Sequence, residues 1–178
     1  MRWQRLFADL EAELAAGAAG QAVERVAELT RAELSTVAFI DRLRAEVGGA
    51  VRVHLRDGSA LGGRLTDVGG SWLLLDGDGE HVVPLGAVVA VSSARDGRRV
   101  AGPPTAVERR LGLGSVLRAL ARDRAKVTLR ASSLTAVGLV AGVGADHLEL
   151  AVLGEDGLRP SGQVLSVRFE ALDLLSRR

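Results

Sequence analysis

The chain has 178 residues, of which 47% are apolar and 25% are charged, an ordinary composition for a soluble globular protein with one or two cores. Its longest apolar runs fall far short of the roughly 20 residues that span a bilayer, and its first residues lack an apolar signal core, so we expect a cytoplasmic protein with no membrane contact. Because the chain has no cysteine, disulfides and thiolate metal sites are excluded.

The net charge of +1 conceals one strongly basic segment. Residues 94–130 carry ten basic and three acidic side chains, whereas the segments before and after them are slightly acidic. A concentration of one charge sign in an otherwise balanced chain is the main indication of an anionic partner.

Two amphipathic helices are predicted at the start of the chain. Residues 2–16 place apolar side chains at three- and four-residue spacing, and a second stripe of this kind runs through residues 21–47. The glycines and alanines at 17–20 favour a break between the helices, and the glycines at 48–49 end the second helix as a C-terminal cap. We therefore predict a helical hairpin over residues 1–48.

From Ala50 onward the apolar period changes to two, which is typical of half-buried strands. Glycine-containing turns separate the predicted strands from one another. Pro84 lies where one short strand ends, as suits a residue that cannot donate a backbone hydrogen bond. The strands predicted in this half span residues 51–56, 61–67, 71–76, 81–83 and 87–91.

This β-module is repeated later in the chain. The stretch GRLTDVGGSWLLL at 63–75 returns 75 positions later as GLVAGVGADHLEL at 138–150. Two flanking matches extend the repeat: V-x-L at 53–55 returns with a shift of 74, and the stretch at 83–88 returns with a shift of 84. A repeat of this length indicates two copies of one small domain. The strands predicted in the second copy span residues 126–131, 134–141, 146–153, 163–168 and 171–175.

Five short, glycine-bent strands in a module of about 45 residues favour a small closed barrel, because closure protects the sheet edges. We therefore predict an α+β fold in which the helical hairpin is followed by two five-stranded β-barrels, at 49–93 and 125–178, each preceded by a helix. Residues 94–124 between the barrels are predicted to form a basic linker with short helices around 105–111 and 115–122.

The frame V-x-L … G-x-L-x-x-V-G … L-x-L … P-L-x-A-V, preceded by a short helix, resembles the Sm-like (LSm) fold over roughly residues 36–93 and 115–175. This resemblance implies Sm-like five-stranded barrels, RNA binding and assembly into rings through strand edges. The whole chain also resembles a family of actinobacterial proteins often labelled Fis family transcriptional regulator, through the stretch RRLGLGSVLRALARDRA at 109–125.

The basic segment is the candidate nucleic-acid site, because clustered arginines neutralise backbone phosphates. Aromatic residues for base stacking are few, and those in the β-modules, Trp72 and Phe169, are expected to pack in a core or at a subunit contact. The alternative interpretation of the segment is a solvated linker in an arginine-rich chain. The predicted nucleic-acid-binding residues are Arg95, Arg98, Arg99, Arg109, Arg110, Arg118, Arg122, Arg124, Lys126 and Arg130.

No pattern in the chain indicates catalysis, a cofactor or a metal site. His54, His81 and His147 are isolated in the sequence, so surface or strand-packing roles are favoured for them. Residues 76–80 resemble a calcium loop only faintly and lack its later ligands, so a hairpin turn is the better interpretation. Because no nucleophile is paired with a base, we expect a protein that is not an enzyme.

These observations predict a non-enzymatic protein that associates with nucleic acid, with RNA as the expected partner of the basic segment. The alternative is a protein-interaction scaffold or adaptor that uses the helical hairpin and the barrel edges. A homo-oligomer is a separate expectation, either a trimer that closes a ring of barrels or a dimer formed through the long second helix.

Overall fold

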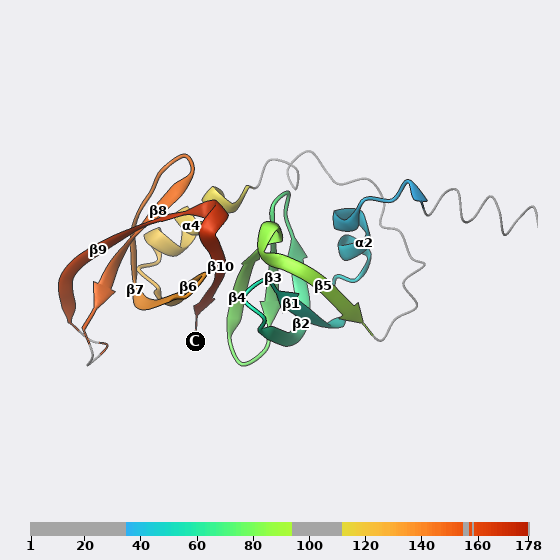
Figure 1. The fold of residues 1–178 in the computed structure, drawn as a ribbon, viewed down its shortest axis with the longest axis horizontal. Helices are drawn as coiled ribbons and strands as arrows, with labels where there is room; N and C mark the ends of the chain where they lie inside the picture. Colours follow the sequence, from blue (N-terminus) through green and yellow to red (C-terminus); the bar gives the residue numbers. More distant parts are fainter. Residues whose placement is uncertain (1–34, 94–111, 155–156, 158, 178) are drawn as a thin grey trace, which may run out of the picture. The chain divides into compact units, whose positions relative to one another are not determined.

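The computed structural model describes residues 35–93, 112–154, 157 and 159–177 (Figure 1). Residues from Phe39 onward belong to one compact unit. Among the described residues, the helices are α2 (Phe39–Ala45) and α4 (Leu113–Arg122), with short 3-10 helices η1 (Leu85–Ala87) and η2 (Phe169–Ala171). The strands are β1 (Ala50–Leu55), β2 (Ala60–Val68), β3 (Trp72–Asp76), β4 (Glu80–Pro84), β5 (Val88–Ser93), β6 (Lys126–Ala131), β7 (Leu134–Val143), β8 (His147–Leu153), β9 (Pro160–Arg168) and β10 (Leu172–Arg177).

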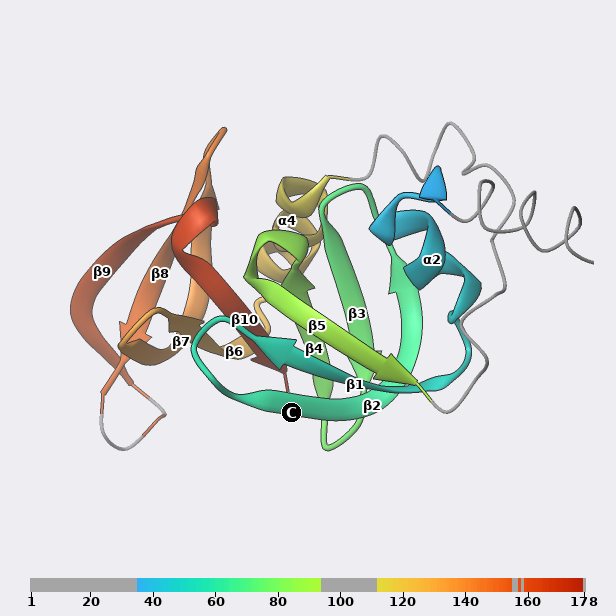
Figure 2. The same ribbon diagram turned by 45° about the vertical axis from the view of Figure 1, so that its right-hand side comes forward.

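These ten strands form one antiparallel sheet. Its order is β5-β1-β2-β3-β4-β10-β6-β7-β8-β9 (Figure 1 and Figure 2). The first five strands make up repeat 1, residues 50–93, and the last five make up repeat 2, residues 126–177. The two repeats have the same internal order, and they join where β4 of repeat 1 pairs with β10 of repeat 2. Among the described strands, β5 and β9 are the two edges of the sheet.

The prediction of two closed, Sm-like five-stranded barrels is wrong. Closure of repeat 1 requires β5 to pair with β4, but β5 pairs with β1 and β4 pairs with β3 and β10. In repeat 2, β9 pairs with β8 and leaves its other side open. Apolar alternation indicates where strands lie and which face is buried. It does not indicate which strands pair, because the backbone N–H and C=O groups of one strand edge can bond to any strand that runs in a suitable direction. The repeats therefore share one open sheet.

The apolar cores also cross the boundary between the repeats. Trp72 and Val82 of repeat 1 are buried in the cluster built by repeat 2 and α4. Leu174 of repeat 2 is buried in the cluster built by repeat 1 and α2. Because burial of apolar surface stabilises a fold by about 25 cal/mol per Å², each repeat contributes to the stability of the other.

The predicted strands are confirmed to within a few residues, and the glycines that recur between the repeats have a steric reason. A Cβ atom at Gly63 would lie 2.7 Å from the carbonyl oxygen of Asp76, and one at Gly138 would lie 2.4 Å from that of Ala151. The neighbouring strand passes too close at these points for any side chain. Both repeats therefore need glycine at this position of the second strand.

The first strand of each repeat aligns differently from the sequence prediction. Val51 lies opposite Gly63 in repeat 1, and Val127 lies opposite Gly138 in repeat 2. The first strands therefore correspond with a shift of 76, not 74. The motif V-x-L is itself periodic, and a slip of two residues keeps every side chain on its face, so the sequence pattern could not distinguish the two alignments.

The predicted helical hairpin is not supported. Residues 1–34, which contain most of it, lie outside the described residues. Where the predicted helix over 21–47 is described, it is interrupted at 36–38, and α2 begins afresh at Phe39. The interruption contains a threonine and a valine, whose branched side chains restrict the helical rotamers, and the threonine hydroxyl also competes for backbone hydrogen bonds.

Each repeat is preceded by a helix, as predicted. Gly48, with φ of 82°, lies between α2 and β1, where a left-handed residue ends a helical segment. α4 begins at Leu113 and lies against β7, with Leu113 and Leu117 buried. In the part of the chain that the structure describes, neither helix has the length and apolarity needed to cross a membrane.

Candidate functional site

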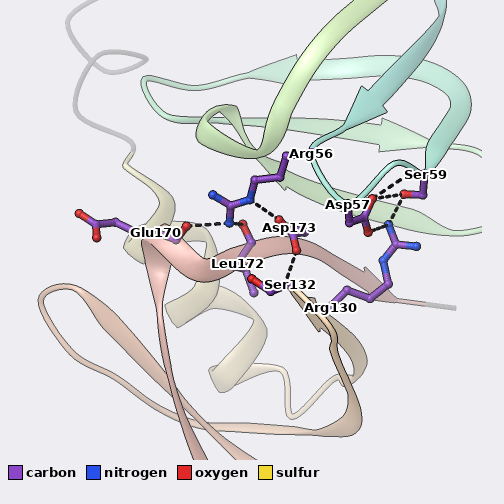
Figure 3. Close-up of polar contacts among 8 residues, drawn as sticks. All are labelled: Arg56, Asp57, Ser59, Arg130, Ser132, Glu170, Leu172 and Asp173. Atoms are coloured by element: carbon purple, nitrogen blue, oxygen red, sulfur yellow. Dashed lines mark hydrogen bonds and ion pairs between the residues drawn. The ribbon is translucent and has the colours of Figure 1, made fainter.

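Polar side chains join the two repeats where β10 meets repeat 1 (Figure 3). Arg56, in the β1–β2 hairpin, donates from Nε to Oδ1 of Asp173 at 2.5 Å and from Nη2 to the carbonyl oxygen of Glu170 at 2.6 Å. Asp173 is fully buried on β10, and its second carboxylate oxygen accepts the backbone N–H of Ser132. Burial of a carboxylate that has no hydrogen-bond donors costs free energy. Arg56 of repeat 1 therefore stabilises the buried Asp173 of repeat 2 by donating to it.

A second arginine crosses the boundary in the opposite direction (Figure 3). Arg130 on β6 lies 2.9 Å from Oδ2 of Asp57 and donates to the hydroxyl of Ser59 at 2.6 Å. Ser59 in turn donates to Asp57 from its hydroxyl and from its backbone N–H. The hydrogen bond from the Ser59 hydroxyl, assisted by the Ser59 N–H and the Arg130 charge, holds the pKa of Asp57 below its ordinary value.

Arg130 is one of the ten predicted nucleic-acid-binding residues, and the structure gives it a different task. Its half-buried side chain is held by Asp57 and Ser59, so its charge is used within the sheet. We therefore leave Arg130 out of the candidate surface. Five further predicted residues lie outside the described residues: Arg95, Arg98, Arg99, Arg109 and Arg110.

The other four predicted residues make up what we call the candidate cationic surface: Arg118, Arg122, Arg124 and Lys126. All four are exposed, and none of them forms an ion pair with another described residue. Arg118 and Arg122 lie one turn apart on the same face of α4. Lys126 donates to the carbonyl oxygen of Gly157 at 3.0 Å, a contact that leaves its positive charge uncompensated.

Two of the described acids, Asp123 after α4 and Glu80 on β4, share a cation of their own. Asp123 lies 3.8 Å from Arg177, which lies at the same distance from Glu80. Both contacts are long and exposed, so they contribute little to stability. They nevertheless place Arg177 between the two carboxylates, which leaves the four cations of the candidate surface in excess.

The aromatic residues of the two repeats pack in the protein. Trp72 is buried, and its indole lies over Gly69, where a Cβ atom would approach Nε1 to 2.2 Å. Phe169 is half-buried against the cluster of repeat 2. The predicted packing role of both side chains is confirmed. The buried ring of Trp72 is closed to base stacking, whereas the half-buried ring of Phe169 lines a cavity of about 310 Å³ together with Pro84 and Leu113.

The structure assembles a serine, a histidine and an aspartate that sequence reasoning did not connect. Nδ1 of His81 lies 2.9 Å from Oγ of Ser176, and Nε2 lies 2.7 Å from Oδ1 of Asp78. His81 and Ser176 face each other across the β4–β10 boundary. No spacing in the sequence signals such a pair, because only the pairing of two distant strands creates it.

His81 does not line the cavity next to this arrangement. A cavity of about 190 Å³ lies beside β4, β10 and α4, and apolar residues such as Val82 and Leu120 line it. Ser176 borders this cavity, but side chains alternate along a strand, so its hydroxyl and His81 project to the face opposite Val82. The ring of His81 is buried, which confirms the strand-packing role predicted for it.

The other two histidines, His54 and His147, lie on β1 and β8. His147 is 2.9 Å from Asp146, and the hydrogen bond from its ring lowers the pKa of that exposed carboxyl. His54 is exposed on β1. Among the described residues, no three histidine, aspartate or glutamate side chains are grouped as metal ligands.

Comparison with known proteins adds no relative to this picture. No protein-family model matches the chain, and no curated protein matches it. Neither comparison identifies the Sm-like or the Fis-family resemblance.

Proposed function

We propose that this protein is not an enzyme and that it binds RNA through phosphate contacts on the candidate cationic surface. The exposure of Arg118, Arg122, Arg124 and Lys126, without an ion-pair partner in the described residues, supports the proposal. Four such cations contact about four phosphates, and each contact releases condensed counterions. The binding is insensitive to base identity, because the aromatic residues of both repeats pack against the protein.

The salt dependence of binding tests this proposal. The full chain is titrated into a fluorescent single-stranded RNA at several salt concentrations, beside the variant Arg118→Gln/Arg122→Gln. Loss of two phosphate contacts on a single strand is expected to reduce the slope of log affinity against log salt by about 1.4. The matched control is Arg52→Gln/Arg64→Gln, which removes the same charge from exposed positions on β1 and β2 and leaves the slope within error.

Two results would contradict RNA binding at this surface. One is the absence of binding by the wild-type chain at low salt. The other is an equal loss in the two double variants, which would reduce the effect to net charge. A duplex DNA and a single-stranded DNA of matched length show whether the surface prefers RNA or accepts any phosphate backbone.

A second candidate function, a protein-interaction scaffold, is favoured by the two sheet edges. Val89 on β5 is 68% exposed and Val164 on β9 is 56% exposed. Edge strands are usually protected by charged residues or proline, but β5 contains neither, and β9 has them only at its ends, as Pro160 and Arg168. The helical hairpin that this alternative also used lies largely outside the described residues. Lysine at either edge is expected to abolish partner capture, whereas nuclease treatment leaves it intact.

A further inference from the structure

We infer that β9 of one molecule pairs with β5 of a second molecule. This contact between chains would have the same geometry as the β4–β10 pairing within each chain. The inference deepens the scaffold proposal, because it names a second copy of this chain as the partner. It rests on the same two sheet edges, and it is independent of the candidate cationic surface.

The internal repeat makes the two edges complementary. β4 and β9 are the fourth strands of their repeats, and β5 and β10 are the fifth. The boundary within the chain joins a fourth strand to a fifth strand, β4 to β10. Among the described strands, the fourth and fifth strands that keep a free side are β9 and β5. Each molecule therefore has a free fourth strand at one edge of its sheet and a free fifth strand at the other. These are the two kinds of strand that already pair at the β4–β10 boundary.

Burial shows what this pairing contributes. In β10, residues 172–175 are all buried, whereas the corresponding residues 88–91 of β5 are exposed or half-buried. At the bulge residue of each strand, Asp173 is fully buried and Val89 is 68% exposed. Pairing β5 with a fourth strand would remove this apolar surface from water, which favours association.

The known boundary fixes the register of the proposed one. Within the chain, Arg177 lies opposite Glu80, and Ser176 lies opposite His81. The fourth and fifth strands of the repeats both correspond with a shift of 84. Applied to the free edges, this shift places Ser93 opposite Val164 and Ser92 opposite Leu165 of the second molecule.

A cavity beside β5 fits the arriving strand. Its volume is about 220 Å³, and α2 and the last residues of β5 line it, including the exposed Phe39 and Arg42. The corresponding cavity beside β10 and α4 is bordered by repeat 1 through Leu74, Glu80 and Val82. The cavity beside β5 thus corresponds to the cavity beside β10, except that no fourth strand borders it within the chain.

The residues that would arrive at this cavity suit its lining. Val164 of the second molecule corresponds to Glu80 and meets the exposed side chain of Phe39. Glu149, which is exposed on β8 and corresponds to Leu74, brings a carboxylate toward Arg42. Because Glu46 also lines this cavity, Glu149 meets both signs of charge there, and the complementarity is carried by the apolar contact between Val164 and Phe39.

The proposed contact is apolar where the known boundary is charged. Val89 stands where the buried Asp173 pairs with Arg56, and Ser93 and Val164 stand where Arg177 faces Glu80. If β4 paired with β5 in place of β10, Arg56 would lie beside Val89 in place of Asp173 and would lose its carboxylate partner, which is unfavourable for a charge. Molecules therefore join head to tail, as a closed ring or an open filament according to the rotation at each contact.

Cysteine cross-linking tests the pairing and its register, because the natural chain has no cysteine. The double variant Ser93→Cys/Val164→Cys is oxidised under mild conditions and separated by non-reducing electrophoresis. Its two sulfurs lie at opposite edges of the sheet, so a disulfide links different molecules. We expect covalent dimers and larger species. The control pair Glu80→Cys/Arg177→Cys, at the known boundary, is expected to close within one chain without a change in mass.

A second control tests register, and light scattering tests assembly without cross-links. The pair Val89→Cys/Val164→Cys, which is out of register, is expected to cross-link far less. The wild-type chain should have the mass of an oligomer, and Val164→Lys should have the mass of one chain, because lysine blocks an edge strand. Thr66→Lys, at an exposed position on the interior strand β2, adds the same charge and should retain the oligomer.

Two results would overturn the inference. They are a one-chain mass for the wild-type protein at the concentration of the cross-linking experiment, and cross-links that ignore register. If the edges then capture a different protein, the scaffold proposal stands while self-pairing fails. RNA binding by Val164→Lys is measured separately, since the candidate cationic surface does not include this edge.

Discussion

Nε of Arg56 lies 2.5 Å from Oδ1 of Asp173, although 117 positions separate the two residues in the chain. The contact places the guanidinium of Arg56, in the hairpin of repeat 1, on a fully buried carboxylate in β10 of repeat 2. In repeat 1 the residue that corresponds to Asp173 is Val89, at an open edge. The same strand position is thus acidic where the other repeat of the chain supplies an arginine, and apolar where β5 is an edge of the sheet.

Replacement of Asp173 by alanine should weaken the boundary between the repeats. The change removes the acceptor for Arg56 and leaves the N–H of Ser132 without its carboxylate, so we expect a loss of about 1–3 kcal/mol in the free energy of unfolding. Urea unfolding at neutral pH measures it. Asp76→Ala removes an exposed aspartate at the end of β3 and should change stability little. Equal losses in the two variants would contradict a special role for the boundary pair.

The stability contributed by Asp57 should depend on pH. Its pKa is lower in the folded state than the ordinary value of about 3.9, because Ser59 and Arg130 favour the charged form. The contribution is therefore complete above that ordinary value and is lost as the pH falls through the lower folded pKa. Wild type and Asp57→Asn should differ in unfolding free energy at neutral pH and converge below about pH 4. A difference that persists or grows in acid would be evidence against this origin.

Adjacent glycines in β2 should respond differently to alanine. At Gly63 the added Cβ would lie 2.7 Å from the backbone oxygen of Asp76, so the strands must separate, at a cost of about 1–3 kcal/mol. At Gly62 the space within 4 Å is open, and the same substitution should be nearly neutral. Thermal or urea unfolding of the two variants compares them directly. Similar stability would mean that the close strand approach is not the reason for the recurring glycine.

Ser176 should not behave as an activated nucleophile. Its hydroxyl is held by His81 in the strand ladder, on the face away from the adjacent cavity. Incubation with a serine-reactive phosphonate should therefore leave the mass of the protein unchanged, while a serine hydrolase in the same tube is labelled. An adduct on Ser176 that disappears in His81→Ala would instead identify a working base and refute the proposal that the protein is not an enzyme.

Sequence reasoning succeeded for local structure and failed where the outcome depended on distant strands. Alternating apolar residues located the strands, because side chains of a strand must alternate between faces. The same reasoning could not locate the contacts of Arg130, which it assigned to a solvent-facing basic cluster. Its partners Asp57 and Ser59 lie more than seventy positions away and meet it only after the repeats have joined.

The chain by itself therefore determined the number and place of the strands, the glycines that recur between the repeats, and the duplication. Only the tertiary structure decided that β4 pairs with β10 instead of with β5, so that two expected barrels became one shared sheet. The physical reason is that side-chain patterns encode burial, whereas strand pairing is made by backbone N–H and C=O groups that are the same in every strand. Which edges meet is decided by the packing of both repeats at once.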